Sequence, residues 1–183
     1  RNAVLDQIVG NHKLSSILDD VAHRLEAINP EMIVSILLLD RSKGQLFTGA
    51  APSLPDFYNT AINGLTPGFG RGSCGTSAFT GEPVIVIDID NHPYWEPYLE
   101  LTQRAGLHAC WSLPIKDDCG QVIGTFAIYY KKRCAPKVTD LELVGEFARI
   151  TALAIQKVHA ADAIRRSAAV FEHTRDGVLI TDL

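Results

Sequence analysis

Apolar residues recur every three or four positions in two stretches, one near each end of the chain. This spacing is typical of a helix with one buried face. The first stretch covers residues 14–28 and ends at Asn29-Pro30, because the residue before a proline avoids the helical region. The second covers residues 139 to about 168, and Thr139 followed by Glu142 predicts a capping box at its start. About 30 residues at 1.5 Å each span roughly 45 Å, so we expect the end of this helix to project beyond the domain.

Short apolar segments between these two helices predict strands. Two of them, residues 32–39 and 84–87, are almost continuously apolar, which indicates that both faces of each strand are covered. Polar turns at residues 40–44 and 116–120 join successive strands closely, so we expect antiparallel pairing. The predicted strands are residues 32–39, 45–50, 84–87, 109–115 and 122–130.

The order of these elements predicts an α+β fold. Short helices are expected at residues 56–63 and 98–105, while the glycine-rich residues 64–75 and the polar, aromatic residues 88–97 are expected to form loops. One central antiparallel sheet would then carry the N- and C-terminal helices on one face. The loops and short helices would form a pocket on the other face.

Composition limits the classes of function. The 183 residues are 46% hydrophobic and 21% charged, which is typical of one globular domain and the start of a second. Seventeen basic and 21 acidic side chains give a net charge of −4, which disfavours nucleic-acid binding. No apolar run approaches the roughly 20 residues of a membrane span, and no signal peptide is visible. Four cysteines without a C-x-x-C pair favour a reducing, cytoplasmic location and give no metal motif.

Three segments resemble the GAF domain of bacterial sensory proteins. Residues 70–86 are similar to the glycine-rich loop and central strand of that family, and residues 106–115 and 120–130 are similar to its fourth and fifth strands. The resemblance covers residues 14 to 158. It implies a GAF-like antiparallel sheet and a sensory, non-catalytic role in signal transduction, with small-molecule binding passed along the C-terminal helix.

The end of the chain resembles the opening of a PAS domain. Residues 168–182 are similar to the short helix, the Asp-Gly pair and the first strand of that family. We therefore assign residues 1–160 to the GAF domain, with its first helix within residues 1–29, and residues 161–183 to the end of a signalling helix and a truncated PAS domain. The first residue is Arg1, so we expect a piece of a longer protein. In proteins with this domain order the output module is commonly a cyclic-di-GMP synthase or phosphodiesterase, or a histidine kinase, so the resemblance implies one of these.

A G-x-G-x-x-G pattern formed by Gly70, Gly72 and Gly75 invites a dinucleotide interpretation, with Asp90 twenty residues beyond Gly70 as the ribose-binding acid. Such a loop must follow a strand and open a helix. The residues before it are polar and carry a proline, and an extended segment follows soon after. We therefore expect a loop in which glycine allows positive φ and a close backbone approach.

Cys74 is a candidate nucleophile. Its surroundings, residues 72–76, resemble those in free methionine-R-sulfoxide reductases, which are GAF-like enzymes. Those enzymes carry a catalytic cysteine in a His-x-x-Cys-Asp pattern, and the matching stretch here runs from His92 to Glu96 with Trp95 in place of that cysteine. Sulfoxide reduction needs an attacking and a resolving thiol. We therefore assign no catalytic residue and expect Cys74 to be a small buried side chain, with a redox enzyme using Cys74 and Cys110 as the alternative.

No motif supports a particular cofactor. His92 or His108 could each ligate a haem, since a haem needs only one proximal histidine, but neither has the spacing of a metal site. Cys110 is followed by Trp111, whereas a bilin-binding GAF cysteine is typically followed by histidine. The motif of cyclic-nucleotide-binding GAF domains does not map onto this sequence. The cofactor therefore stays unassigned, with haem and cyclic nucleotide as open alternatives and no metal site.

The carboxylates of Asp88, Asp90 and Glu96 could serve acid–base chemistry, but no base, nucleophile or metal motif accompanies them, so a solvated loop is expected. An apolar pocket under the glycine loop could be lined by Tyr94, Trp95, Tyr98 and Trp111, with a simple core as the rival interpretation. The expected lining residues are Phe69, Cys74, Tyr94, Trp95, Trp111 and Phe126.

We expect a homodimer in which the first and last helices of two protomers form a parallel bundle. Nothing predicts a nucleic-acid or membrane partner within this sequence. A scaffold GAF domain with a filled pocket, which only dimerises, is the alternative within the same fold.

Overall fold

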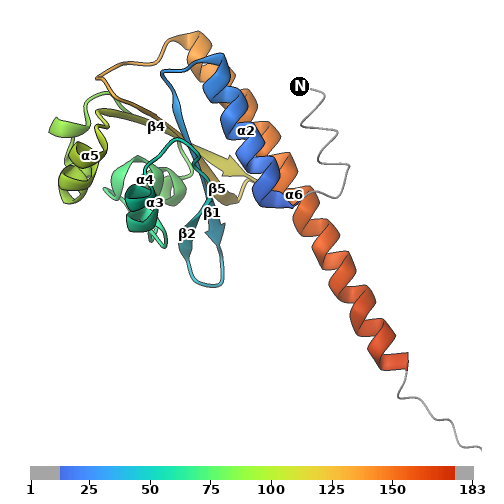
Figure 1. Ribbon diagram of the computed structural model, residues 1–183. Coiled ribbons are helices and arrows are strands. Elements are labelled where there is room, and N and C mark those ends of the chain that lie inside the picture. Colours follow the sequence, from blue (N-terminus) through green and yellow to red (C-terminus); the bar gives the residue numbers. More distant parts are fainter. Residues whose placement is uncertain (1–12, 176–183) are drawn as a thin grey trace, which may run out of the picture.

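The computed structural model describes residues 13–175 and is built around one five-stranded antiparallel sheet (Figure 1). Its strand order is β2-β1-β5-β4-β3, with every neighbouring pair antiparallel. All five predicted strands are confirmed to within a residue or two at their ends. Their bounds are β1 (Ile33–Asp40), β2 (Gln45–Ala50), β3 (Val84–Val86), β4 (Ala109–Lys116) and β5 (Val122–Tyr130).

Helices cover both faces of this sheet, as the α+β prediction requires (Figure 1). The long helices α2 (Leu14–Ile28) and α6 (Val138–Arg175) pack side by side on one face. The opposite face carries three short helices and two 3₁₀ turns. These are α3 (Asp56–Ile62), α4 (Gly72–Thr80), η1 (Ile89–Asn91), η2 (Pro93–Tyr98) and α5 (Leu99–Ala105). No helix among residues 13–175 is long and apolar enough to cross a membrane.

The sheet separates two hydrophobic cores. Successive residues of a strand point to opposite faces, so Phe126 and Ile128 of β5 pack towards α2 and α6, whereas Ala127 and Tyr129 face the short helices. The same alternation along β4 sends Trp111 towards the long helices and Cys110 to the other side. Both strands are therefore buried on both faces.

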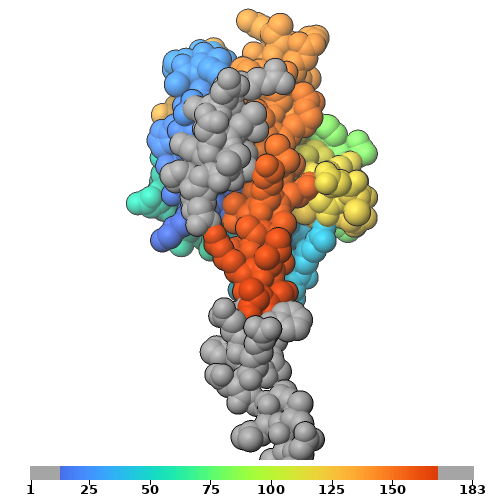
Figure 2. Space-filling view, turned by 90° about the vertical axis from the view of Figure 1, so that its right-hand side faces the viewer, coloured from blue at the N-terminus to red at the C-terminus, as the bar shows by residue number. Residues whose placement is uncertain are grey.

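Helix α6 is longer than predicted and projects from the domain. Its 38 residues span about 57 Å at 1.5 Å per residue. Val144, Ala148 and Ile155 are buried against the rest of the domain, but from His159 to Ala168 every residue except the half-buried Asp162 is exposed. Figure 1 shows α6 running beside α2 and continuing past the edge of the domain, and Figure 2 shows the face of the molecule on which α6 lies. The predicted projection is confirmed.

The predicted capping box at the start of this helix is wrong. The helix begins one residue earlier, at Val138, so Thr139 lies inside its first turn. The backbone N–H of Lys137 donates a hydrogen bond to the Asp140 carboxylate at 3.2 Å. Asp140 therefore provides the side chain that ties down the helix start, and an acidic group there also suits the helix dipole.

The helix α4 was not expected, because its sequence contains Gly72 and Gly75 and glycine disfavours helices. All residues from Gly72 to Ala78 are buried, so tertiary packing outweighs this weak propensity. The expected positive φ values are confirmed at Gly70 (74°) and Gly72 (60°). The segment does open a helix, contrary to the sequence-based expectation, but no strand leads directly into it.

Two glycine substitutions should change stability in opposite directions. A Cβ added at Gly124, in the buried part of β5, would collide with the Leu37 carbonyl oxygen of β1. We expect Gly124→Ala to destabilise the fold by about 1–3 kcal/mol. Gly145, within α6, has only the end of a flexible arginine side chain near its Cβ position, at 3.9 Å. Gly145→Ala should stabilise by up to about 1 kcal/mol. Thermal unfolding measures both, and a neutral Gly124→Ala would contradict this packing.

Candidate functional site

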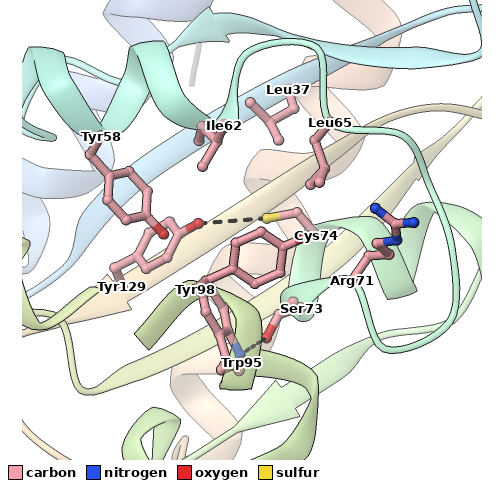
Figure 3. Close-up of a pocket in the computed structure, with 11 residues that line it drawn as sticks. Leu37, Tyr58, Ile62, Leu65, Arg71, Ser73, Cys74, Trp95, Tyr98 and Tyr129 are labelled. Atoms are coloured by element: carbon pink, nitrogen blue, oxygen red, sulfur yellow. Dashed lines mark hydrogen bonds between the residues drawn. The ribbon is translucent and has the colours of Figure 1, made fainter. Parts of the chain in front are cut away.

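A small cavity lies between α4 and the sheet face opposite α2 and α6 (Figure 3). Its volume is about 20 Å³, which is room for about one water molecule. Side chains and backbone from α3, α4, η2 and two strands contribute its walls. The lining residues are Leu37, Tyr58, Ile62, Leu65, Arg71, Gly72, Ser73, Cys74, Trp95, Tyr98 and Tyr129.

Four aromatic rings make up much of the cavity wall. Tyr129 of β5 meets Tyr58 edge to face at 5.6 Å between ring centroids and meets Trp95 at 6.2 Å. Trp95 also meets Tyr98 at 6.2 Å in the same arrangement. Edge-to-face contacts of this kind are favourable beyond the area that they bury. The rings therefore form one connected set around the Cys74 sulfur.

A chain of hydrogen bonds ties the cavity wall to the sheet. The Trp95 indole N–H donates to Ser73 Oγ at 3.2 Å (Figure 3), and the Ser73 hydroxyl donates to the Cys110 carbonyl at 3.2 Å. Both side chains are buried. This relay links η2 to α4 and α4 to β4 through one serine side chain.

The thiol and phenol groups at the bottom of the cavity are shielded from water. The Cys74 sulfur lies 3.8 Å from the Tyr129 hydroxyl. Burial raises the pKa of Tyr58 and of Tyr129 well above the usual tyrosine value. The hydrogen bond from Cys110 lowers the pKa of Cys74, whereas burial raises the pKa of Cys110 well above its usual value. The described chain contains no disulfide, and Cys119 and Cys134 are also free thiols.

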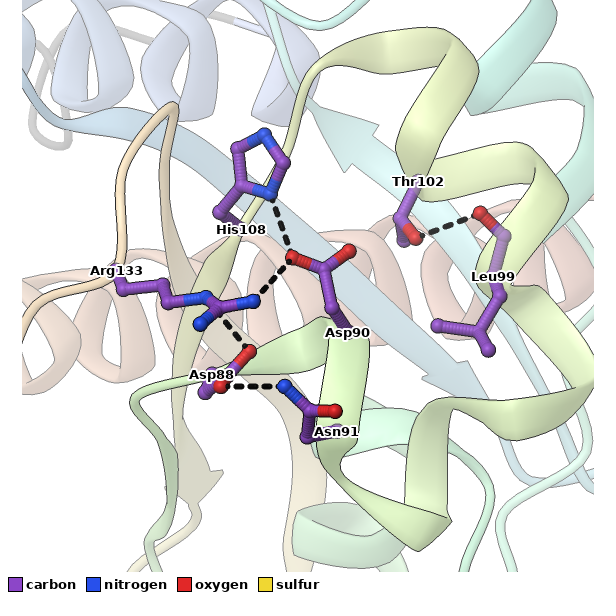
Figure 4. Close-up of polar contacts among 7 residues, drawn as sticks. All are labelled: Asp88, Asp90, Asn91, Leu99, Thr102, His108 and Arg133. Atoms are coloured by element: carbon purple, nitrogen blue, oxygen red, sulfur yellow. Dashed lines mark hydrogen bonds and ion pairs between the residues drawn. The ribbon is translucent and has the colours of Figure 1, made fainter.

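The two candidate haem ligands lie apart from this cavity. His108 Nδ1 contacts the Asp90 carboxylate at 2.8 Å, in a cluster with Asp88 and Arg133 (Figure 4). The hydrogen bond to His108 holds the pKa of Asp90 below its usual value. His92 Nδ1 accepts a hydrogen bond from the Tyr94 backbone N–H at 3.3 Å. Within residues 13–175 no three His, Cys, Asp or Glu side chains are grouped so that they could hold a metal ion.

A family model matches the larger part of the chain. The GAF domain model covers residues 11–156. The chain belongs to the GAF domain family.

A curated relative of this GAF domain is the methyl sulfide methyltransferase-associated sensor of Methanosarcina acetivorans. The two sequences are 36% identical over 186 residues, which covers 100% of this chain and 19% of that protein. The chain thus spans about a fifth of the length of this relative.

Solved structures share the fold at lower identity. A domain of a two-component sensor histidine kinase protein from Sinorhizobium meliloti matches with a TM-score of 0.71 and 22% identity, covering 85% of this chain and 99% of the other. The free methionine-R-sulfoxide reductase of Neisseria meningitidis matches with a TM-score of 0.66 and 23% identity, covering 86% and 89%. At these identities the similarity shows the fold alone, and the fold includes both sensor domains and enzymes.

Only two of the six residues that we expected to line the pocket lie at the cavity of this GAF domain. Cys74 and Trp95 line it. Phe69 and Tyr94 lie outside the lining; their rings touch edge to face at 5.2 Å, and Phe69 is 68% exposed.

Trp111 and Phe126 do not line the cavity, because the strand alternation turns both towards α2 and α6. Trp111 instead lies against the Tyr130 ring at 4.6 Å, and its indole N–H donates to the Cys134 carbonyl at 3.3 Å. Cys134 lies between β5 and α6. Trp111 therefore helps to hold the chain just before α6.

Tyr98, one of the aromatic residues expected near the pocket, does line the cavity, but Tyr58 and Tyr129 were missed. These two lie on α3 and β5, which meet only in the folded chain. Alternation does signal that Tyr129 and Tyr130 face opposite sides of the sheet. It does not tell which side carries the cavity.

Two buried serines of α4 provide a matched test of the hydrogen-bond relay. Ser73 accepts from Trp95 and donates to the Cys110 carbonyl, whereas the Ser77 hydroxyl has no hydrogen-bond partner among the described residues. Both side chains are fully buried. Ser73→Ala should cost about 1–3 kcal/mol because it leaves a buried indole N–H unpaired, and Ser77→Ala should be neutral or stabilising. Denaturant unfolding measures the difference, and equal effects of the two substitutions would refute the relay.

Proposed function

We propose that this GAF domain is a non-catalytic sensory module that binds a small molecule between α4 and the sheet and passes the change to α6. The observation that carries the proposal is the cavity itself. It is lined by aromatic rings and offers the polar groups of Tyr58, Cys74 and Tyr129, which is the usual composition of a small-molecule site. The curated relative named as a sensor, 36% identical along the whole chain, supports the same role.

A ligand of ordinary size requires this cavity to open. Its 20 Å³ is far below the roughly 300 Å³ or more of small-molecule sites. A ligand would therefore bind an open state better than the closed one and shift the population towards it. The sheet is the stiffer wall, so the opening would displace α4 and η2. The ligand-free protein is the closed state in this proposal.

A redox enzyme is the less favoured alternative. The sulfoxide reductases share the fold, but in the stretch from His92 to Glu96 that resembles their catalytic pattern this chain has a buried tryptophan, Trp95, in place of the cysteine. The Trp95 indole lines the cavity and donates a hydrogen bond to Ser73. A bulky, hydrogen-bonded ring at this position favours binding over thiol chemistry.

A ligand-free scaffold is the second candidate, and the nearly filled cavity is the observation that favours it.

In both proposals the domain forms a homodimer through α2 and α6. It belongs to a longer cytoplasmic protein with a PAS domain and an output module, which is a cyclic-di-GMP enzyme or a histidine kinase. Residues 168–175 continue α6 here, and the remainder of the segment that resembles a PAS domain lies outside the described residues. The curated relative, of which this chain spans 19%, supports a longer parent.

Native mass spectrometry with an absorption spectrum of the same sample tests the sensor proposal. An added mass that is lost on denaturation, or a visible absorption band, is expected if the cavity holds a co-purified ligand. Tyr129→Phe should reduce the bound fraction because it removes the hydroxyl beside Cys74. Tyr130→Phe is the matched control, because Tyr130 belongs to the core on the opposite face. No added mass, together with no thermal stabilisation by a metabolite extract, would favour the scaffold.

The dimer proposal makes a separate prediction. Leu153, Ala160 and Ile164 are exposed and recur after seven and four residues, so they lie on one face of α6. Leu153→Glu and Ile164→Glu should each raise the dimer dissociation constant by about tenfold or more, since each would bury a charge against an apolar partner surface. Sedimentation velocity measures this, with Arg166→Glu as the control for added negative charge, because Arg166 is exposed and lies on the opposite side of α6. A wild-type chain that is monomeric at high concentration would refute this dimer.

A further inference from the structure

A segment of seven residues, 131–137, joins β5 to α6 and is tied to a distant part of the chain. Arg133 within it forms an ion pair with Asp88 at 3.0 Å and another with Asp90 at 3.4 Å (Figure 4). These carboxylates lie just before and within η1. One guanidinium thus bridges the linker that starts α6 and the segment that leaves β3.

The two carboxylates are held by more than the arginine. Asp90 also contacts His108 Nδ1 at 2.8 Å, and Asp88 accepts a hydrogen bond from the Asn91 amide at 2.8 Å. Both carboxylate side chains are mostly buried, at 27% and 19% exposure for Asp88 and Asp90. Isolated exposed ion pairs contribute little to stability, but a network with fixed partners defines geometry more firmly. We call Asp88, Asp90, His108 and Arg133 the clasp.

One end of the clasp is continuous with the cavity wall. Asp90 lies in η1, and the next turn, η2, carries Trp95 into the cavity. The two turns are connected directly, because the Trp95 N–H donates to the His92 carbonyl at 2.9 Å and the His92 N–H donates to the Ile89 carbonyl at 3.3 Å. A displacement of Trp95 would therefore move the clasp carboxylates.

The other end of the clasp lies close to the start of α6. Arg133 precedes Val138 by five residues, and the neighbouring Cys134 carbonyl is fixed by the Trp111 indole. The alternative path from the cavity to α6 leads through β4 and β5, whose backbones are hydrogen-bonded to neighbouring strands on both sides. These backbone hydrogen bonds resist a displacement of the strands. The clasp is thus the more direct connection between η2 and the start of α6.

We propose that Arg133 is a positioning residue that couples the cavity wall carrying Trp95 to the first turns of α6. The inference rests on the proposed sensory function for its purpose, since a ligand that displaces η2 would use this coupling. The coupling itself is a property of the ligand-free protein. It can therefore be measured without a ligand, and a failure of ligand binding and a failure of coupling are separate results.

Hydrogen exchange in a double-mutant cycle tests the coupling. Trp95→Phe perturbs the wall by removing the bond to Ser73. Arg133→Gln cuts the clasp. Lys132→Gln is the matched control, because Lys132 lies on the same linker but pairs with Glu31, away from the cavity. The readout is amide exchange in residues 131–142 of the full chain, with residues 33–40 of β1 as the internal reference for global unfolding.

Trp95→Phe alone should accelerate exchange in residues 131–142 by about fivefold, which corresponds to about 1 kcal/mol of local stability. With Arg133→Gln already present, Trp95→Phe should add less than about twofold, whereas with Lys132→Gln the full acceleration should persist. Equal acceleration in all three backgrounds, or none in the wild type, overturns the proposal. If Trp95→Phe does not fold, Ser73→Ala removes the same hydrogen bond without leaving the volume of an indole empty.

Discussion

The burial of β4 and β5 on both faces is the constraint on which the rest of this GAF domain depends. Each strand supplies one row of side chains to the cavity and one row to the long helices. Neighbours in sequence thus serve opposite faces, as Cys110 and Trp111 do, and as Tyr129 and Tyr130 do. A single layer of strands separates the proposed binding site from α6. Side chains on its two faces belong to neighbouring residues of the same strand, so the two faces lie close together.

The two hydrophobic cores differ in how well their side chains fill the space and in whether their buried polar groups are hydrogen-bonded. On the helix side, large apolar and aromatic side chains fill the space between the sheet, α2 and α6. The cavity side contains small residues of α4, such as Gly72 and Ser73, and also fully buried hydroxyls without partners among the described residues, such as Ser35 and Ser77. Unpartnered buried polar groups cost free energy, so this side is the easier one to open. That asymmetry suits a domain in which one face binds and the other face transmits.

The similarity to sulfoxide reductases shows how little of a function the fold decides. The same fold occurs in a free methionine-R-sulfoxide reductase and in a domain of a sensor histidine kinase protein. The chemistry depends on the few residues that reach the cavity. In this chain Trp95 reaches it, and its indole is used for packing and for one hydrogen bond to Ser73.

The sequence by itself determined the strands, the two long helices, the antiparallel pairing and the family. These features depend on hydrophobic periodicity and tight turns, which involve residues that are neighbours in sequence. It failed at α4, where burial of the helix outweighs the poor propensity of Gly72 and Gly75. It also misplaced Trp111 and Phe126, because strands that are apolar on both faces carry no polar side to show which row faces which core. The tyrosines around Cys74 and the contacts of Arg133 with Asp88 and Asp90 join residues far apart in the chain. Only the tertiary structure decided these, since no local pattern records which distant side chains will meet.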